Sequence, residues 1–265
     1  MRYVHISKLA IAIALSVVFL AALVSAQSSP TVRPEGPDTI NISDSQRGNE
    51  QNAGVLVQAQ AGNVTALSIY HGTLTNSWQG YYGNVTGAIE LTNAAGTAFY
   101  RWENANPLGE IFAANGTSTD WTSVYCVNTT NSSKGKYPFA RHAGDVQGWN
   151  ITVVEQNFGI NLTDADGLNE TYNGTWTGSI TVAGKTIDSL DGCSVAYPYQ
   201  GGAESVVWEQ LLLSDNDTII FTGIIEQSQN AFDSSPADFQ LLVLENGHTT
   251  QADSITNYYF YVELS

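Results

Sequence analysis

Short runs of alternating apolar and polar residues, separated by turn residues, follow one another from Gly54 to the end of the chain. Such alternation predicts β-strands with one buried face. Residues 88–92 and 97–102 flank Asn93-Ala94-Ala95-Gly96 and predict a hairpin. No long stretch of the sequence places apolar residues at helical spacing. The pattern therefore predicts an all-β protein of one or two immunoglobulin-like β-sandwich modules.

Turn residues also divide the second half of the chain, at 183–185, 215–217 and 246–247. A Thr-Gly-small-Ile-x-aliphatic pattern occurs twice, at residues 86–91 and 177–182. This repeat is compatible with two sandwich halves, 53–126 and 127–265, within a β-rich domain at 53–265. One strand type that recurs in a single sheet explains the repeat equally well.

The first 26 residues resemble a secretory signal peptide. Basic residues precede an apolar run from Leu9 to Val24, and small residues end it at Val24-Ser25-Ala26. The run is shorter than the roughly 20 residues that a membrane-spanning helix needs. We expect cleavage after residue 26, a secreted protein, and no membrane span in the mature chain. A retained anchor and a pilin-type leader, cut before the apolar run, remain open alternatives.

Residues 27–52 are rich in proline, serine and acidic residues and offer little besides Ile40 and Ile42 to bury. Such a segment cannot offset the entropy lost on ordering, so we expect a flexible tail. Strand-like residues Gly54–Gln60 follow it. This arrangement predicts a segment that inserts as a missing strand into the sheet of a neighbouring copy.

Glycosylation sequons are far more frequent than chance allows. Asn-x-Ser/Thr without an intervening proline occurs eleven times, whereas 21 Asn and 48 Ser plus Thr in 265 residues predict about 4. These sites are glycosylated only on exported chains and at exposed Asn residues. The sequence thus predicts a cell-surface glycoprotein that carries N-linked glycans at Asn41, Asn63, Asn84, Asn115, Asn128, Asn131, Asn150, Asn161, Asn169, Asn173 and Asn216.

Charge excludes one class of partner. The chain has 9 basic and 25 acidic side chains, and loss of residues 1–26 removes two basic and no acidic ones, which leaves a net charge of about −18. Nucleic acid binding depends on clusters of Lys and Arg that this sequence lacks, so nucleic acid is excluded as a partner.

Two features predict particular sites. Cys126 and Cys193 are the only cysteines, and an even number in an exported chain predicts one disulfide, with two buried free thiols as the alternative. Asp164-Ala165-Asp166-Gly167 is a fragment of a calcium-binding loop, so Asp164 and Asp166 are candidate calcium ligands. The glutamate that would complete an EF-hand is missing, and a solvated turn is the alternative. No other cofactor is predicted.

The sequence predicts no enzyme. The mature chain has three widely separated histidines and neither a His-Glu-x-x-His nor a Gly-x-Ser-x-Gly motif. Six tryptophans and thirteen tyrosines permit a surface for stacking carbohydrate. However, Tyr100 and Trp102 alternate on one face of a strand, which predicts burial in the core. Tyr81 and Tyr82 point to opposite faces of an extended chain, so at most one of them is expected in the core.

The segment Trp78-Gln79-Gly80-Tyr81-Tyr82-Gly83-Asn84-Val85-Thr86-Gly87 resembles a motif in a family of secreted archaeal β-rich surface proteins. The similarity continues at residues 99–102, 107–113, 208–213 and the tyrosine-rich C-terminal strand. It covers most of residues 60–265. The resemblance implies an exported surface or filament component and supplies no catalytic residues.

The distribution of sequons suggests how copies assemble. Seven sequons lie between Asn115 and Asn173, whereas residues 217–265, the most apolar stretch, contain none. A subunit of an assembly needs such an apolar face without glycans. We expect an extracellular structural glycoprotein, a subunit of a cell-surface filament or array that assembles with itself through β-strand complementation. The alternative is a carbohydrate-binding surface adhesin.

Overall fold

The computed structural model describes residues 32–48, 54–104, 107–129, 151–161, 163–215, 217–245 and 256–264. The chain divides into two units, Met1–Arg33 and Pro34–Ser265, and all the strands belong to the second. The predicted signal peptide lies outside the described residues. Within the described ranges, no helix is both long and apolar enough to cross a membrane.

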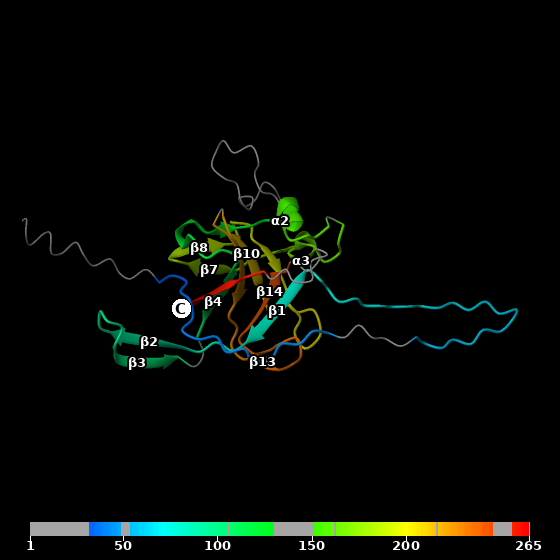
Figure 1. Ribbon diagram of the computed structural model, residues 1–265, viewed down its shortest axis with the longest axis horizontal. Helices are drawn as coiled ribbons and strands as arrows, with labels where there is room; N and C mark the ends of the chain where they lie inside the picture. Colours follow the sequence, from blue (N-terminus) through cyan, green and yellow to red (C-terminus); the bar gives the residue numbers. More distant parts are fainter. Residues whose placement is uncertain are drawn as a thin grey trace, which may run out of the picture. The chain divides into compact units, whose positions relative to one another are not determined.

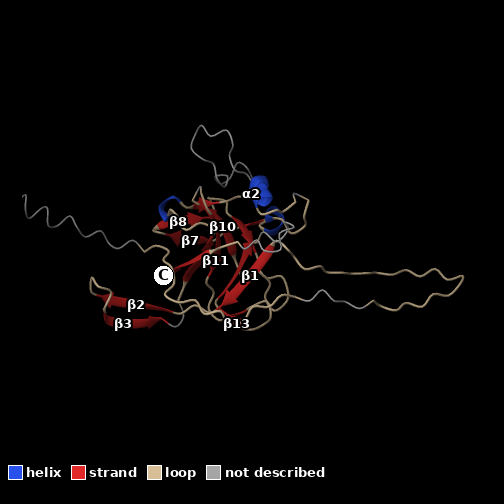
Figure 2. Cartoon of the chain, viewed as in Figure 1, coloured by secondary structure: helices blue, strands red, loops and turns tan. Residues whose placement is uncertain are grey.

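The largest sheet has seven antiparallel strands (Figures 1 and 2). The strand order is β15-β4-β11-β10-β9-β6, and β5 pairs with the same edge of β10 as β9 does. The strands span Tyr259–Leu264 (β15), Gly109–Ala114 (β4), Ile219–Ile224 (β11), Gln210–Ser214 (β10), Ser194–Ala196 (β9), Gly174–Thr175 (β6) and Tyr125–Cys126 (β5).

Four two-stranded sheets and three short helical segments make up the rest of the described secondary structure. The all-β prediction is thus confirmed. The strand pairs are β1 (Trp78–Gly83) with β14 (Phe239–Leu244), β2 (Gly87–Thr92) with β3 (Ala98–Asn104), β7 (Ser179–Val182) with β8 (Lys185–Asp188), and β12 (Gln229–Asn230) with β13 (Pro236–Ala237). The helical segments are η1 (Trp121–Ser123), α2 (Ile151–Asn157) and α3 (Leu168–Thr171).

Both faces of the large sheet are packed, as alternation along its strands requires. One face, which carries Ala113, Leu212 and Phe221, lies under β14 and the segment around α2 and α3. The other face carries Phe112, Leu211 and Ile220 and packs against the β7–β8 hairpin. We call these the β14 face and the β7–β8 face. Strands from both predicted halves, 53–126 and 127–265, belong to this one sheet.

The predicted hairpins form. β2 and β3 flank Asn93–Gly96, where the Gly96 N–H donates to the Asn93 carbonyl oxygen at 2.9 Å and Gly96 has a φ of 78°. β7 and β8 join through Ala183 and Gly184. β10 ends at Ser214 and β11 begins at Ile219, on either side of the predicted turn at 215–217, of which residue 216 lies outside the described residues. The turn predicted at 246–247 lies outside the described residues.

One expectation about the aromatic residues is wrong. Tyr100 and Trp102 share a face of β3, but they are 56% and 51% exposed rather than buried. The alternation is present, yet no described element covers that face. The expectation for the adjacent tyrosines is confirmed, because Tyr81 packs against the core and Tyr82 is 48% exposed.

The apolar C-terminal stretch is mostly core. Ile219 to Phe221 of β11 are buried, as are Leu241, Val243 and Leu244 of β14. These residues therefore do not form the exposed apolar face that the lack of sequons suggested. Among the described strands of this stretch, β15 fits that suggestion best, because most of its residues are half-buried.

The predicted tail contacts β15 through Glu35. Glu35 forms an isolated antiparallel bridge with Val262 of β15, with N···O distances of 3.0 and 2.8 Å. Pro34 is buried, whereas the other described residues of the tail, 35–48, are exposed and form no strand.

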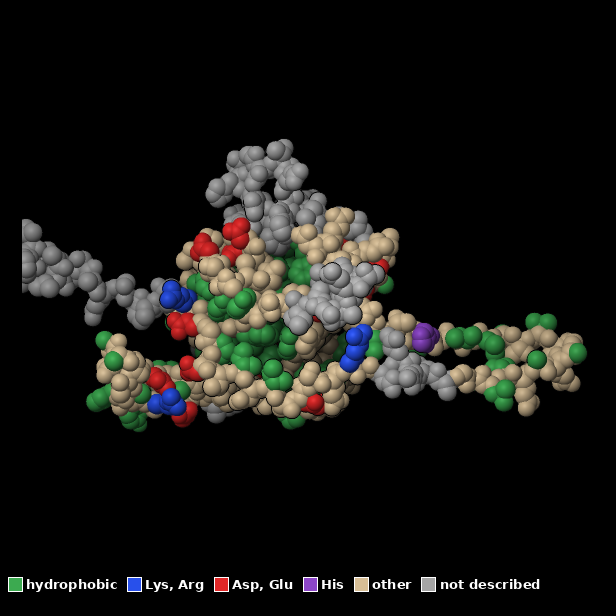
Figure 3. All heavy atoms as spheres, in the orientation of Figure 1, with side chains coloured by type: hydrophobic (Ala, Val, Ile, Leu, Met, Phe, Trp, Pro, Cys, Tyr) green, Lys and Arg blue, Asp and Glu red, His purple; other side chains and the backbone are tan. Residues whose placement is uncertain are grey.

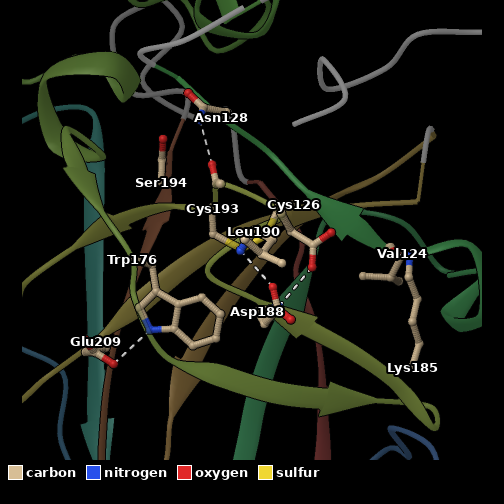
Figure 4. The surroundings of a disulfide bond; sticks show 12 residues. Val124, Cys126, Asn128, Trp176, Lys185, Asp188, Leu190, Cys193, Ser194 and Glu209 are labelled. Carbon is tan, nitrogen blue, oxygen red and sulfur yellow. Dashed lines mark hydrogen bonds between the residues drawn. A yellow bond between two sulfur atoms is a disulfide. The ribbon is translucent and has the colours of Figure 1, made fainter. Parts of the chain in front are cut away.

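The predicted disulfide between Cys126 and Cys193 is present, with the two Cα atoms 4.8 Å apart. It joins β5 to the residue before β9, the two short strands that share one edge of β10. Figure 4 shows the indole of Trp176 close to this bond; its N–H donates to Glu209 Oε2 at 2.9 Å. The disulfide lies in the core cluster of the β7–β8 face.

Gly109, the first residue of β4, allows β15 to approach closely. Its φ is 133°, and a Cβ atom at this position would collide with the backbone carbonyl of Glu263. We expect Gly109→Ala to lower the free energy of unfolding by about 3 kcal/mol, because both the backbone conformation and the β4–β15 pairing resist the added methyl group.

Chemical denaturation of Gly109→Ala would measure this loss. Gly80→Ala is the matched control, since the nearest atom to an added Cβ there lies at 3.9 Å and the backbone needs no special φ. Equal stabilities of the two variants would contradict the expectation.

Candidate functional site

β1 has an outer edge with no described partner. The Ser77 carbonyl oxygen accepts a hydrogen bond from Glu245 N at 2.7 Å, so the backbone groups of Ser77, and of every second residue after it, point toward β14. Because bonding directions alternate along an antiparallel strand, the backbone N–H and C=O groups of Trp78, Gly80 and Tyr82 point away from β14. Among the described residues, none bonds to these groups. We call this row the β1 edge; such an edge is a template for another strand.

An apolar surface lies beside the β1 edge, because the β1–β14 pair covers only part of the large sheet. β14 lies against β10 and β11, and β1 reaches β15 through Tyr81 and Phe260, whose ring centroids are 5.2 Å apart. Phe260, Val262 and Leu264 are consequently only half-buried. Figure 3 shows hydrophobic side chains gathered in this region, between β15 and β1 in the orientation of Figure 1. Partial burial raises the pKa of the Tyr81 hydroxyl.

Residues 54–74, which we call the arm, contain two strand-like runs without a strand partner. A turn separates the runs, where Asn63 N donates to the Gln60 carbonyl oxygen at 3.2 Å. Within the described residues neither run joins a sheet. Seven large apolar side chains of the arm are 56 to 102% exposed: Val55, Leu56, Val57, Val64, Leu67, Ile69 and Tyr70.

Of the two runs, only the first, Gly54–Gln60, is predicted above as a strand. The signal for the second was also present, because Val64-Thr65-Ala66-Leu67-Ser68-Ile69-Tyr70 combines β-branched and aromatic residues as a strand does. The β1 edge could not be found in the same way, since the partner of each strand follows only from the tertiary fold.

Hydrogen bonds fix the short segment between the arm and β1. Asp166 Oδ2 accepts from Thr75 Oγ1 at 2.5 Å and from Ser77 Oγ at 3.0 Å, while its carbonyl oxygen accepts from the Trp78 indole at 2.6 Å. Arg47 donates to Asn76 Oδ1 at 2.9 Å. The arm therefore leaves the folded domain from a defined base.

Both candidate calcium ligands take part in hydrogen bonds of this region. Asp164 Oδ2 accepts from the backbone N–H of Asn161 at 2.9 Å, and Asp166 supports the base of the arm. In the ranges that the structure describes, no group of three or more His, Cys, Asp or Glu side chains is arranged to hold a metal ion. Calcium binding at Asp164 and Asp166 stays a prediction.

Most sequon asparagines that the structure describes are on the surface. Seven of these eight are exposed: Asn41, Asn63, Asn84, Asn115, Asn161, Asn169 and Asn173. Asn128 is half-buried, and its side-chain amide donates to the Gly192 carbonyl oxygen at 2.6 Å (Figure 4). The other three sequons, at Asn131, Asn150 and Asn216, lie outside the described residues.

Comparisons with known proteins add no identification. A scan against protein-family models, a search of curated proteins and a search of solved structures each found no match.

Proposed function

We propose that the protein is an extracellular structural glycoprotein, a subunit of a cell-surface filament or array, in which the arm of one copy adds a strand to the β1 edge of the next. The observation that carries this proposal is the arm, whose seven large apolar side chains are exposed and unpaired. A strand without a partner and an edge without a strand are complementary, because their backbone groups satisfy one another.

The dimensions of the two elements agree. A strand rises about 3.3 Å per residue, so the run of residues 64–70 can extend along all six residues of β1. The side chains on one face of the added strand would cover Tyr81, Phe260 and Val262, which are half-buried in the single copy. Backbone bonds would supply affinity, and these apolar contacts would fix the register.

Donation to a second copy is favoured over pairing of the arm with its own β1. Residues 71–77 separate the second run of the arm from β1, and Thr75 and Ser77 within them are held by hydrogen bonds to Asp166. Pairing of this run with β1 of the same copy would need the chain to reverse within these seven residues, which the two hydrogen bonds oppose. Because donor and acceptor are different surfaces, each added copy presents a new acceptor, and the contact produces an open polymer rather than a closed pair.

Export and glycosylation are part of the same proposal. They are supported by the excess of sequons, by the exposure of seven of their Asn side chains, and by the disulfide. Asn63 lies at the turn between the two runs of the arm, so a glycan there would stand at the tip and leave both runs available.

Complementation between two defective copies tests this proposal. A mature chain without residues 54–72 keeps the β1 edge, and a Gly80→Pro chain keeps the arm but has lost an outward N–H and presents a ring to an incoming strand. We expect each variant alone to be monomeric and an equimolar mixture to form a one-to-one complex, while the intact mature chain forms polymers.

Light scattering measures the masses of the two variants and of their mixture. As a control, thermal unfolding of each variant should match that of the intact mature chain, which shows that both fold. Replacement of the seven exposed apolar arm residues by serine, which keeps the length of the arm, is expected to abolish the complex. The proposal fails if the intact mature chain with its native glycans stays monomeric at high concentration.

One observation favours the adhesin as a second candidate. Tyr100 and Trp102 form an exposed aromatic pair with ring centroids 4.7 Å apart. Specific binding to a glycan array that is lost in Trp102→Ser, together with a monomeric intact chain, would favour the adhesin.

A further inference from the structure

Asn128 differs from the seven exposed sequon asparagines because its side chain is built into the fold. It is half-buried, and its Nδ2 atom donates to the Gly192 carbonyl oxygen at 2.6 Å, across 64 residues of sequence (Figure 4). Asn173 also donates to a carbonyl oxygen, that of Glu170, but Asn173 is exposed and its partner is only three residues away. The amide of Asn128 therefore serves as a tertiary contact.

The neighbours of Asn128 are held in the same way. The Val127 carbonyl oxygen accepts a hydrogen bond from Ser194 N at 3.0 Å. Thr129 N donates to Ser194 Oγ at 2.8 Å, and the Thr129 hydroxyl donates to the Tyr172 carbonyl oxygen at 2.5 Å. All three residues are thus bonded to parts of the chain that lie at least 43 positions away.

The disulfide fastens this arrangement. Cys126 directly precedes the segment 127–129, and Cys193 lies between Gly192 and Ser194, which bond to that segment. Both cysteines are buried. A covalent bond as well as several hydrogen bonds therefore resists separation of the two segments.

Glycan transfer needs the same amide nitrogen. Nδ2 forms a bond to the anomeric carbon of a sugar, and its proton passes to a base of the transferring enzyme. The bond from that carbon to the phosphate of a lipid carrier breaks, and the phosphate leaves with the electron pair. The enzyme must enclose the acceptor side chain, and the bulky glycan must reach solvent. A half-buried amide that donates to Gly192 meets neither requirement while the two segments stay together.

We propose that glycosylation of Asn128 and closure of the Cys126–Cys193 disulfide exclude each other. In the disulfide-bonded protein Asn128 stays unmodified and acts as a hydrogen-bond donor, whereas the seven exposed sequon asparagines accept glycans. A chain that receives a glycan at Asn128 before it folds cannot bring Gly192 into place, and its two thiols stay free. The exclusion rests on the export and glycosylation of the proposed function, and it uses no residue of the arm or of the β1 edge.

Glycan transfer in vitro tests the exclusion on the full mature chain, produced without glycans. The disulfide-bonded chain, the Cys126→Ala, Cys193→Ala double variant, and the reduced and alkylated chain are each incubated with an oligosaccharide transferase and a lipid-phosphate-linked sugar. Mass spectrometry of peptides measures occupancy. We expect at least about tenfold more glycan at Asn128 in the two forms without the disulfide, because a disulfide that closes so long a loop shifts an opening equilibrium by more than about a factor of ten. Asn63, at the exposed turn of the arm, is the matched control and should be modified equally in all three forms.

Asn128→Asp tests the structural role of the amide without any glycan. The carboxylate cannot donate to the Gly192 carbonyl oxygen and repels it, so we expect the melting temperature of the disulfide-bonded chain to fall by about 4 °C or more. Asn173→Asp changes only an exposed, local hydrogen bond and should shift the melting temperature by less than about 1 °C. Equal shifts would contradict the role of Asn128 as a tertiary contact.

Three results of the transfer experiment would overturn the exclusion. The first is a glycan at Asn128 in peptides that the disulfide also joins, either in vitro or in protein from the native source. The second is an Asn128 that stays unmodified in the reduced chain, because its sequence rather than the fold would then prevent transfer. The third is an equal rise at Asn173 in the double variant, because general unfolding would then expose both sites.

Failure of the proposed function gives different results. If native protein carries no glycans but transfer in vitro follows the expected pattern, only the predicted glycosylation fails. A monomeric intact chain with that pattern would refute only strand donation.

Discussion

At about pH 9 the protein is expected to be less stable than at pH 4.5 by roughly 4 to 5 kcal/mol, and Glu110 is the main cause. Glu110 of β4 lies directly opposite Glu263 of β15. Both side chains are buried on the β7–β8 face, and Glu263 accepts hydrogen bonds from the backbone N–H of Ala183. Burial, and then the charge of Glu263, raise the pKa of Glu110 from 4.5 to about 8.

The direction of the effect follows from which state binds the proton. In the unfolded chain Glu110 ionises near pH 4.5, whereas in the folded chain it keeps its proton up to about pH 8. The stabilising contribution is therefore complete below pH 4.5, decreases as the pH rises, and is lost above about pH 8. Burial also raises the pKa of Glu263, which adds to the effect in the same direction.

Urea unfolding at several pH values between 4.5 and 9 will measure this dependence. Glu110→Gln keeps the shape of the side chain and cannot ionise, so we expect its free energy of unfolding to change far less over this range. Glu103→Gln is the control, because Glu103 is highly exposed, and it should retain the wild-type dependence. A wild-type stability that is flat between pH 4.5 and 9 would contradict the assignment.

This pair of carboxyl groups has a consequence for the proposed assembly. β15 pairs with β4 across Glu110 and Glu263, and its opposite face supplies Phe260 and Val262 beside the β1 edge. Ionisation of the pair would weaken the pairing that holds these apolar residues in place. We therefore expect strand donation to be stronger in acid than in alkali.

The sequence was sufficient for the parts of this fold that are local. Alternating apolar residues and a turn at Asn93–Gly96 specify the β2–β3 hairpin, and the same reasoning located β7, β8, β10 and β11. The two cysteines leave one possible disulfide, with two buried free thiols as the alternative, and the disulfide is present. The hairpin predictions depend on residues that are close together in sequence, and the disulfide prediction depends on there being only two cysteines to pair.

The candidate site needed tertiary information. Whether Tyr100 and Trp102 are covered depends on what lies above β3, and alternation along the strand is the same in either case. Similarly, β1 becomes an open edge only because β14 takes one side and no described residue takes the other. The lack of sequons in residues 217–265 does not tell which apolar residues there are core and which are surface, and β11 and β14 form the centre of the core.

Removal of the disulfide is expected to lower the free energy of unfolding by about 4 kcal/mol, from the entropy of the loop that it closes. The bonded cysteines are 67 residues apart in sequence. β5 and β9 each pair with β10 through only two residues. Hydrogen bonds also join the two segments directly, because Ser194 N donates to the Val127 carbonyl oxygen at 3.0 Å and Asn128 donates to that of Gly192 at 2.6 Å. If β5 and β9 detached from β10, the core around Trp176 on the β7–β8 face would be exposed.

Denaturation of the Cys126→Ala, Cys193→Ala double variant, compared with wild type in the presence and absence of a reducing agent, will measure this contribution. Reduction should destabilise the wild type and leave the variant unchanged. The β1 edge and the arm lie away from this cluster, so a variant that still folds should polymerise in the cold and lose its polymers at a lower temperature than wild type. A loss below about 1 kcal/mol would mean that contacts in the unfolded chain already restrict the loop, because the entropy gained on opening it would then be small.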